Sequence, residues 1–381
     1  MIYIFAMFGY LFVQSIRFEL NKKTNKDPFL YIIIIFVLAF SYNNGSDWVH
    51  YQIFYENVIP YIELSDILSG EQRFEIGYVL LNFLFYKFLN YELFMGLILS
   101  VCIFLLIKFL TFYSHNRYIA IIIFMTLYLF ISSIEPVIRQ MISLTIIVYG
   151  FKFIERNLFF KYLLVILIAG QFHQSAYLLL ILYFIKGIRL KLEHVIFLLF
   201  CFFLLLKNID YVLFGLSNVM PFLTKYIIYL SVDEYGTEKS RTILGNLFLY
   251  SQLAVYYIII LKSKTTKLIK NMAYFFIVIS ILVIYFPIIS RINNYFIFAL
   301  AVSISYIGTL IRIPKLRIVL ISILLVINLL VFFREIQRTE YSAFKYLEYH
   351  NYFIEIMKGN VFENSSDKIE DYQGSLGLKQ R

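Results

Sequence analysis

Long uninterrupted apolar runs constrain the fold of this chain more than any other feature. The segments 31–40, 118–131 and 318–333 leave no room for a polar helix face, and segments such as 32–35 and 258–260 do not alternate. In lipid only helices and closed barrels satisfy the backbone, and a barrel strand alternates polar and apolar residues. Only 15% of the residues are charged, against about a quarter in soluble domains. The sequence therefore predicts an all-α, polytopic transmembrane helical bundle.

The apolar runs predict about 12 membrane spans, because a spanning helix needs about 20 apolar residues, and fewer where flanking side chains snorkel. We place the spans near 2–16, 29–42, 93–113, 118–132, 138–152, 161–173, 175–187, 194–207, 244–261, 271–289, 292–311 and 317–333. The first run has no preceding positive charge and no small-residue cleavage site, so we expect it to be kept as a span.

The net charge of +10 comes from lysines and arginines in short clusters between the apolar runs. This pattern indicates orientation signals and not nucleic-acid binding, so we expect no nucleic-acid partner. With the clusters inside, the outer side holds a long loop after the second span (43–75), a loop near 208–243, and both chain ends. We divide the chain into a transmembrane domain, 1–333, and a polar C-terminal tail, 334–381.

The segment 76–92 decides whether all basic clusters fall on one side. It is largely apolar but short, and Asn90, Tyr91 and Glu92 close it. We expect it to dip into the membrane and return, or to lie along it. The alternative is a full crossing, with one orientation elsewhere wrong.

Six charged or titratable residues fall on the predicted outer side, away from the basic clusters: Asp47, Glu75, Glu135, Arg139, His173 and Arg291. A charged side chain at membrane depth costs about 2.5–3.5 kcal/mol on insertion scales. We therefore treat each of these residues as a candidate for a functional or ion-pairing role. The loop 43–75 also holds the only tryptophan, Trp48. We expect the isolated polar groups to converge on this loop.

Arg139 begins an apolar helix, where backbone N–H groups and a guanidinium together favour an anion. The alternative is an ion pair with Glu135, one helical turn away. Arg291 is either a second anion-binding arginine or a snorkelling interfacial one. His173, at a tight turn, is either a hydrogen-bonded structural residue or an acid, base or phosphate donor.

Asp47 and Glu75 are either solvated loop acids or a carboxylate base and its partner. The chain has no zinc pattern, phosphate-binding loop, dinucleotide-binding glycine motif or serine nucleophile elbow. It also lacks an obvious closely spaced carboxylate pair for Mg²⁺. We therefore predict no cofactor and no metal, with arginines in place of a metal if the protein is an enzyme.

Four short motifs occur in a recognisable order: Gly45-x-Asp47-x-x-x-Tyr51, Phe74-Glu75-x-Gly77-Tyr78, Ile138-Arg139-Gln140 and Phe172-His173-Gln174-Ser175-Ala176, with Arg291-x-x-x-Tyr295 as a weaker fifth. In this order and spacing the chain resembles EpsG-like membrane proteins, which are similar to the O-antigen polymerases (Wzy). Tyr42-Asn43 departs from the pattern, because many relatives are expected to carry an arginine there.

The resemblance implies a GT-C-like bundle in the bacterial inner membrane that joins undecaprenyl-pyrophosphate-linked oligosaccharide repeat units at the periplasmic face. Partners would be the lipid-linked donor and acceptor, membrane lipids and, as a further partner the resemblance allows, a chain-length regulator. It implies catalytic roles for Asp47, Glu75 and His173. It also implies substrate or pyrophosphate binding by Arg139, Gln140 and Arg291, with Trp48, Tyr51, Tyr55, Tyr78 and Tyr295 as aromatic contacts.

Two other classes of membrane protein share this composition. A flippase or transporter of lipid-linked glycans would favour polar residues at mid-membrane and repeat-related halves, which the sequence does not show. A membrane glycan acyltransferase would need a His/Asp-type base and a path for the acyl donor. We therefore predict that the protein is a metal-independent glycosyltransferase.

Overall fold

The structure is a computed structural model that describes residues 2–21, 28–45, 47–70, 72–135, 137–188, 243–284, 289–337, 349–361 and 367–369, with isolated positions between 190 and 204. Within these residues every regular element is a helix, and one isolated bridge pairs Ser41 with Asn351. The predicted all-helical class is therefore confirmed. The predicted span 194–207 and outer loop near 208–243 lie almost wholly outside the described residues.

The chain folds as two compact units. The first comprises Met1–Tyr183 and Ile311–Arg381, and the second Phe184–Leu310. The helices of the first unit are α1 (Ile2–Asn21), α2 (Pro28–Ala39), α3 (Trp48–Ile53), α4 (Leu64–Ser69), α5 (Ile76–Phe85), α6 (Tyr91–Tyr113), α7 (Arg117–Phe124), α8 (Phe130–Ile134), α9 (Ile138–Glu155), α10 (Phe159–Gly170), α19 (Pro314–Ile336) and α21 (Tyr352–Lys358). Short turns of other helix types follow α3 (Phe54–Val58 and Ile59–Tyr61), join α7 to α8 (Met125–Leu129) and follow α10 (Gln174–Leu180). Helix α11 (Ile181–Ile185) contains the boundary between the two units.

Three helices in the described part of the chain are long and apolar enough to cross a membrane: Tyr91–Tyr113, Arg117–Ile134 and Pro314–Arg334. Asn90 and Asn116 cap the first two, each accepting a hydrogen bond from the backbone N–H three residues on. Every side chain from Tyr118 to Phe124 is buried, so this helix lies at the centre of the first unit. The chain is thus a helical membrane protein by composition and length, while the number of about 12 spans stays a prediction.

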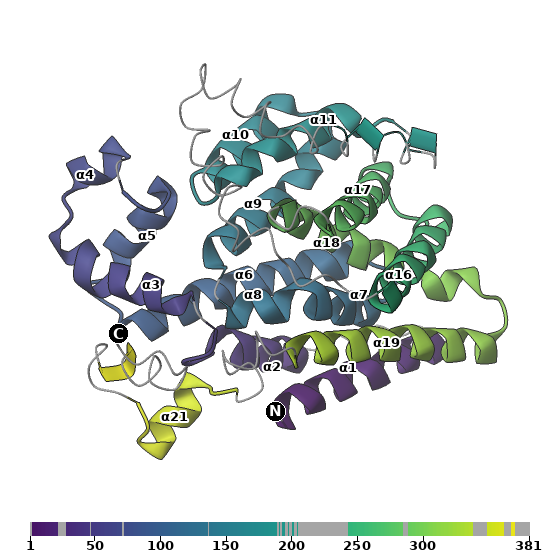
Figure 1. The fold of residues 1–381 in the computed structure, drawn as a ribbon, viewed down its shortest axis with the longest axis horizontal. Helices are drawn as coiled ribbons and strands as arrows, with labels where there is room; N and C mark the ends of the chain where they lie inside the picture. Colours follow the sequence, from purple (N-terminus) through teal and green to yellow (C-terminus); the bar gives the residue numbers. More distant parts are fainter. Residues whose placement is uncertain are drawn as a thin grey trace. The chain divides into compact units, whose positions relative to one another are not determined.

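Helices α1 and α19 pack side by side along one edge of the first unit (Figure 1). The rings of Phe5 and Phe333 stack with centroids 4.8 Å apart. At the predicted inner end of α1, Glu19 is almost fully buried and accepts a hydrogen bond of 2.9 Å from Asn116 Nδ2. Arg317 Nη1 lies 3.8 Å from the other Glu19 oxygen. This buried carboxylate therefore ties α1, α7 and α19 together.

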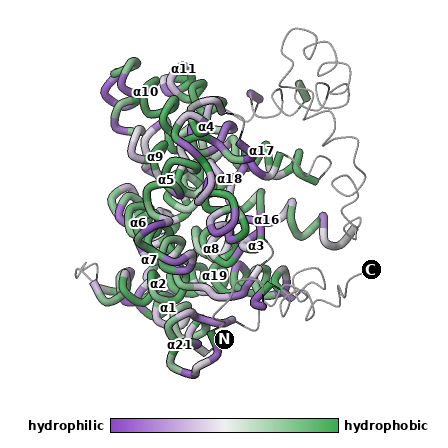
Figure 2. Tube along the Cα trace, turned by 90° about the vertical axis from the view of Figure 1, so that its left-hand side faces the viewer, coloured by the Kyte–Doolittle hydropathy of each residue, from purple (hydrophilic) through white to green (hydrophobic). Residues whose placement is uncertain are grey.

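The stretch 43–75, predicted as a polar loop, folds into short helices. Glu63 and Asp66 form a reciprocal capping box at the start of α4, and Gly70 ends this helix in the left-handed conformation. Hydrophilic residues occur at α3 and α4, whereas hydrophobic residues run along most other helices (Figure 2). Helix α5 has ten residues, a length of about 15 Å, or half of a bilayer core. Its length supports the prediction that 76–92 makes no full crossing.

The chain after α19 returns to the end of α2. Tyr352 N donates to Phe40 O at 2.9 Å, and Tyr42 N donates to His350 O at 3.0 Å. Asn351 Nδ2 donates to Phe36 O at 2.8 Å. Part of the predicted polar tail is therefore packed structure, built against the entrance to the 43–75 stretch.

The second unit contains α16 (Ile243–Lys262), α17 (Lys267–Val283), α18 (Ser290–Ile304) and a short turn at Ile307–Leu310. Helices α17 and α18 form its main packed pair. Asn293 Nδ2 donates to Ser280 Oγ at 2.9 Å between them. These helices overlap three of the predicted spans.

Candidate functional site

A charged cluster forms in the first unit where α3, α5, α9 and the turn after α10 meet. The guanidinium of Arg139 pairs with Glu75 Oε2 through Nη1 and donates from Nε to the Tyr51 hydroxyl at 3.2 Å. His173 Nδ1 lies 3.8 Å from Glu75 Oε1. Four residues spread over more than 120 positions of sequence thus share one site, which we call the Arg139 cluster: Tyr51, Glu75, Arg139 and His173.

The start of α5 is held directly against the turn that carries His173. Gly77 N donates to Gln171 O at 2.9 Å, and a Cβ at Gly77 would lie 2.8 Å from that same oxygen. Only glycine therefore allows the backbones to approach this closely. The glycine in the second motif positions Glu75, two residues earlier, beside His173.

Arg139 lies against an aromatic wall made by Phe74 and Tyr51. Its guanidinium carbon is 4.9 Å from the centroid of the Phe74 ring. The Phe74 and Tyr51 rings stack at 5.3 Å, and Tyr78 contacts both rings edge-on. Arginine is well suited to such a site because its planar group can stack and still donate in its own plane.

A second carboxylate holds the loop that enters α3. Asp47 N donates to Glu135 Oε1 at 3.0 Å. Gly45 has a positive φ of 78°, and a Cβ there would lie 2.7 Å from Ile134 O and would clash with the Glu135 carboxylate. The alternative ion pair between Glu135 and Arg139 is thus wrong, because Arg139 pairs with Glu75 while Glu135 accepts from the Asp47 backbone.

The charges of the Arg139 cluster match one another. Burial raises the pKa of Glu75, but His173 and the Arg139 guanidinium lower it by more, to about 2. Burial also raises the pKa of Tyr51, although Arg139 opposes the shift. At neutral pH the cluster therefore holds an ionised carboxylate, a cationic guanidinium and a neutral phenol.

The side chains of the cluster are partly exposed, although the two ring nitrogens of His173 are buried. The exposed fraction is 25% for Arg139, 14% for Glu75 and 15% for His173. Neither ring nitrogen of His173 has a hydrogen-bond partner among the described residues. A ligand that reaches the cluster would meet a guanidinium, a carboxylate and an imidazole with open hydrogen-bonding capacity.

The Glu75–Arg139 ion pair should make stability depend on pH only in acid. Since the folded-state pKa of Glu75 lies below its unfolded value of 4.5, the stabilisation is complete above about pH 5 and is lost as pH falls toward about 2. At pH 7, Glu75→Gln should lower the Tm by about 2.5 °C, because losing a largely buried pair costs about 2 kcal/mol.

Thermal unfolding of the purified protein in detergent, from pH 8 to pH 3, measures this difference. It should stay constant down to about pH 5 and shrink below about pH 4.5. Glu155→Gln, at an exposed acid that ends α9, is the matched control and should change the Tm little. A difference that already shrinks between pH 8 and pH 6 would contradict the assignment.

The other predicted site residues lie elsewhere. Gln140 is buried within α9, next to Arg139. Arg291 and Tyr295 lie on α18, in the second unit, so their prediction as a second binding group stays a prediction. The side chains of Trp48, Tyr51, Tyr55 and Tyr78 are all at least 95% buried. Their predicted role as stacking faces for sugars would require the stretch 43–75 to open, and it too stays a prediction.

The sequence analysis missed what two groups, Phe74 and Glu135, contact in the site. Phe74 appeared only as part of a motif, yet its ring carries the Arg139 guanidinium. Glu135 was read as a partner for Arg139, yet it anchors Asp47. The glycine at position 45 was the available signal, since a backbone with positive φ often accompanies a tight contact.

The described residues include no group of three or more His, Cys, Asp or Glu side chains that could hold a metal ion. The chemistry available in the cluster is that of an anion receptor next to a carboxylate and an imidazole. A sequence model of the EpsG family matches residues 27–351. Searches of curated proteins and of solved structures found no match.

Proposed function

Because the chain belongs to the EpsG family, we propose that it is a polysaccharide polymerase that joins lipid-linked oligosaccharide repeat units by glycosyl transfer. The donor would be a growing glycan on undecaprenyl pyrophosphate, and the acceptor a hydroxyl of the next lipid-linked unit. The reaction would take place at the periplasmic face of the bacterial inner membrane. The observation that carries the proposal is the Arg139 cluster, in which an arginine fork and a carboxylate meet at the predicted outer side.

The proposed reaction needs an anion clamp and a base. The acceptor oxygen attacks the anomeric carbon, the bond from that carbon to the pyrophosphate oxygen breaks, and the acceptor proton must leave. The departing lipid pyrophosphate carries the negative charge. Arg139 suits the clamp because a guanidinium binds two phosphate oxygens in one plane and stays charged. His173, with its unpartnered ring nitrogens, suits a second phosphate contact.

Glu75 suits the base better than Asp47 does, because Glu75 contacts both Arg139 and His173. In the resting site Glu75 is a weak base, since its pKa is lowered to about 2. A pyrophosphate that takes over the Arg139 guanidinium would remove the cation from Glu75 and bring an anion near it. Both changes raise a carboxyl pKa. Donor binding would therefore prepare Glu75 to accept the acceptor proton.

Asp47 would then have a supporting role. Its backbone N–H is fixed by Glu135, and it precedes α3, which carries Tyr51. Its charge acts on the Tyr51 hydroxyl, which in turn contacts Arg139. We propose that Asp47 tunes the clamp through Tyr51.

A deletion strain tests the function as a whole. Loss of the gene should leave surface glycan of a single repeat unit, because unpolymerised units can still be exported. Absence of all surface glycan would indicate a flippase. Full-length chains that lack a substituent would indicate an acyltransferase. Either outcome would overturn the proposal.

Purified protein with lipid-linked repeat units tests the absence of a metal requirement. Because Arg139 is proposed to bind the pyrophosphate in place of a metal ion, product chains should lengthen equally with and without EDTA. Loss of chain growth in EDTA that is restored by Mg²⁺ would contradict the proposal that an arginine replaces a metal.

A further inference from the structure

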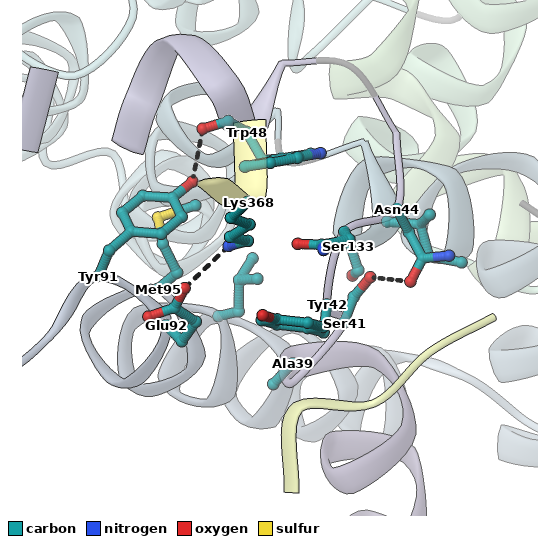
Figure 3. A pocket seen from close by; sticks show the side chains of 13 residues that line it. Ala39, Ser41, Tyr42, Asn44, Trp48, Tyr91, Glu92, Met95, Ser133 and Lys368 are labelled. Carbon is teal, nitrogen blue, oxygen red and sulfur yellow. Dashed lines mark hydrogen bonds and ion pairs between the residues drawn. The ribbon is translucent and has the colours of Figure 1, made fainter. Parts of the chain in front are cut away.

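A lysine from the C-terminal segment, Lys368, is one of the residues that line a pocket beside α3 (Figure 3). Lys368 Nζ donates to Glu92 Oε1 at 2.8 Å and to Gln52 Oε1 at 2.9 Å. The same nitrogen lies 4.3 Å from the centroid of the Trp48 ring and 4.7 Å from that of Tyr42. Only 3% of Lys368 is exposed.

The surroundings of Lys368 are those of an ammonium-binding site. Aromatic faces attract a cation through their negative quadrupole, most strongly where water is excluded. Tyr91 adds a third ring, at 5.7 Å. Glu92 supplies the matching negative charge, without which a buried lysine would lose its proton or leave. We call these five residues around Lys368 Nζ the ammonium cage: Tyr42, Trp48, Gln52, Tyr91 and Glu92.

The ammonium cage and the Arg139 cluster share α3. Trp48 and Gln52 contact Lys368. Tyr51, between them on the same helix, accepts a hydrogen bond from Arg139. Tyr91 also donates to Trp48 O at 3.2 Å, which fastens the start of α3 to α6. A cation in the cage therefore holds the helix that presents Tyr51 to Arg139.

We propose that the ammonium cage is a binding site for a primary ammonium group, that Lys368 is its resident occupant, and that its occupancy positions α3 for the Arg139 cluster. The positioning step rests on the proposed function, but the cage does not. Lys368 is a positioning residue, because it acts on the cluster through Trp48, Gln52 and Tyr51.

The single tryptophan of the chain makes occupancy directly measurable. Trp48 is the only tryptophan, so fluorescence excited at wavelengths that tryptophan absorbs and tyrosine does not reports on the cage and needs no activity. Lys368→Met keeps the length of the side chain and removes the charge. We expect it to shift Trp48 emission and to increase acrylamide quenching by about threefold, because a cation bound by about 0.7 kcal/mol or more is lost.

Added methylammonium should refill the cage. In Lys368→Met protein, titration with methylammonium should return the Trp48 signal saturably toward that of the wild type. Lys152→Met is the matched control, because Lys152 also lies over a tyrosine ring, that of Tyr149, but belongs to α9 and is distant from the cage in sequence. It should show no change and no response to methylammonium. Unchanged fluorescence in Lys368→Met would overturn the cage.

A double variant separates the cage from a general folding defect. In the double variant Lys368→Met/Glu92→Gln, the change in Trp48 fluorescence should be no larger than in either single variant, since each substitution removes the same interaction. Changes in Trp48 fluorescence that add in the double variant would show that Lys368 and Glu92 act independently, and would overturn their pairing.

Polymer synthesis by Lys368→Met should fall by about tenfold, the factor that corresponds to about 1.4 kcal/mol, and should recover with methylammonium. Altered fluorescence with wild-type synthesis would retain the cage and overturn its positioning role.

Discussion

Arg139→Lys is expected to abolish polymerisation while the protein still inserts in the membrane at normal levels. In the resting site Arg139 makes two directed contacts at once, to Glu75 and to the Tyr51 hydroxyl, with its plane against Phe74. A lysine ammonium is a point charge without the planar fork, so it cannot reproduce these contacts or bind two phosphate oxygens side by side. We expect chain growth to fall by at least about 100-fold, the size of effect typical of removing one preorganised electrostatic group.

The length ladder of the surface glycan, compared with membrane-quantified protein, measures the effect. Arg73→Lys is the matched control, because Arg73 also lies near the Phe74 ring but is exposed. It should leave the ladder intact. A full-length ladder from Arg139→Lys would reduce Arg139 to a structural arginine. Arg291→Lys in the same assay tests whether the second predicted arginine takes part.

Glu75→Gln is expected to be nearly as severe, and more severe than Asp47→Asn. The amide keeps the size of the side chain but cannot accept the acceptor proton, and general bases contribute about 10²–10⁴-fold. Asp47→Asn keeps the backbone N–H that binds Glu135, so we expect only a partial loss through Tyr51. His173→Ala should also be partial, because a phosphate donor contributes less than the base.

A structural explanation for the loss in Glu75→Gln is tested by Glu135→Gln. Both variants remove a carboxylate that binds a neighbouring element, but Glu135 anchors the Asp47 backbone and lies outside the Arg139 cluster. If Glu75 acts only by holding the fold, the two variants should lose activity to a similar degree. A normal ladder from Glu75→Gln, or a complete loss from Asp47→Asn alone, would return the role of base to Asp47.

Local patterns in the sequence predicted the parts of the fold and site that depend on local physics. Apolar runs indicated α6, α19 and the continuous helix 117–134, because lipid permits few alternatives to a helix. Tyr51, Glu75, Arg139 and His173 come one from each of the four motifs that the sequence analysis noted, and they meet in one cluster. Two of these motifs contain a glycine, Gly45 or Gly77, at which the backbone contacts another segment closely.

The partners of these residues depend on long-range contacts that local patterns do not encode. The sequence analysis considered an ion pair between Arg139 and Glu135, the acid nearer in sequence, but Arg139 pairs with Glu75. The Glu135 carboxylate lies beside Gly45 and accepts from the Asp47 backbone, while the Gly77–Gln171 contact places Glu75 toward Arg139. Lys368 had no local signal at all, because its cage is made by residues more than 270 positions away.

The return of the chain after α19 also has a consequence for biogenesis. His350, Asn351 and Tyr352 hydrogen-bond with residues 36–44 at the entrance to the 43–75 stretch, and they follow the last predicted span. Ribosomes make the second predicted span and the stretch after it long before these residues exist. The packing around this entrance is therefore completed only late in synthesis, after α19 and the segment that follows it have been made.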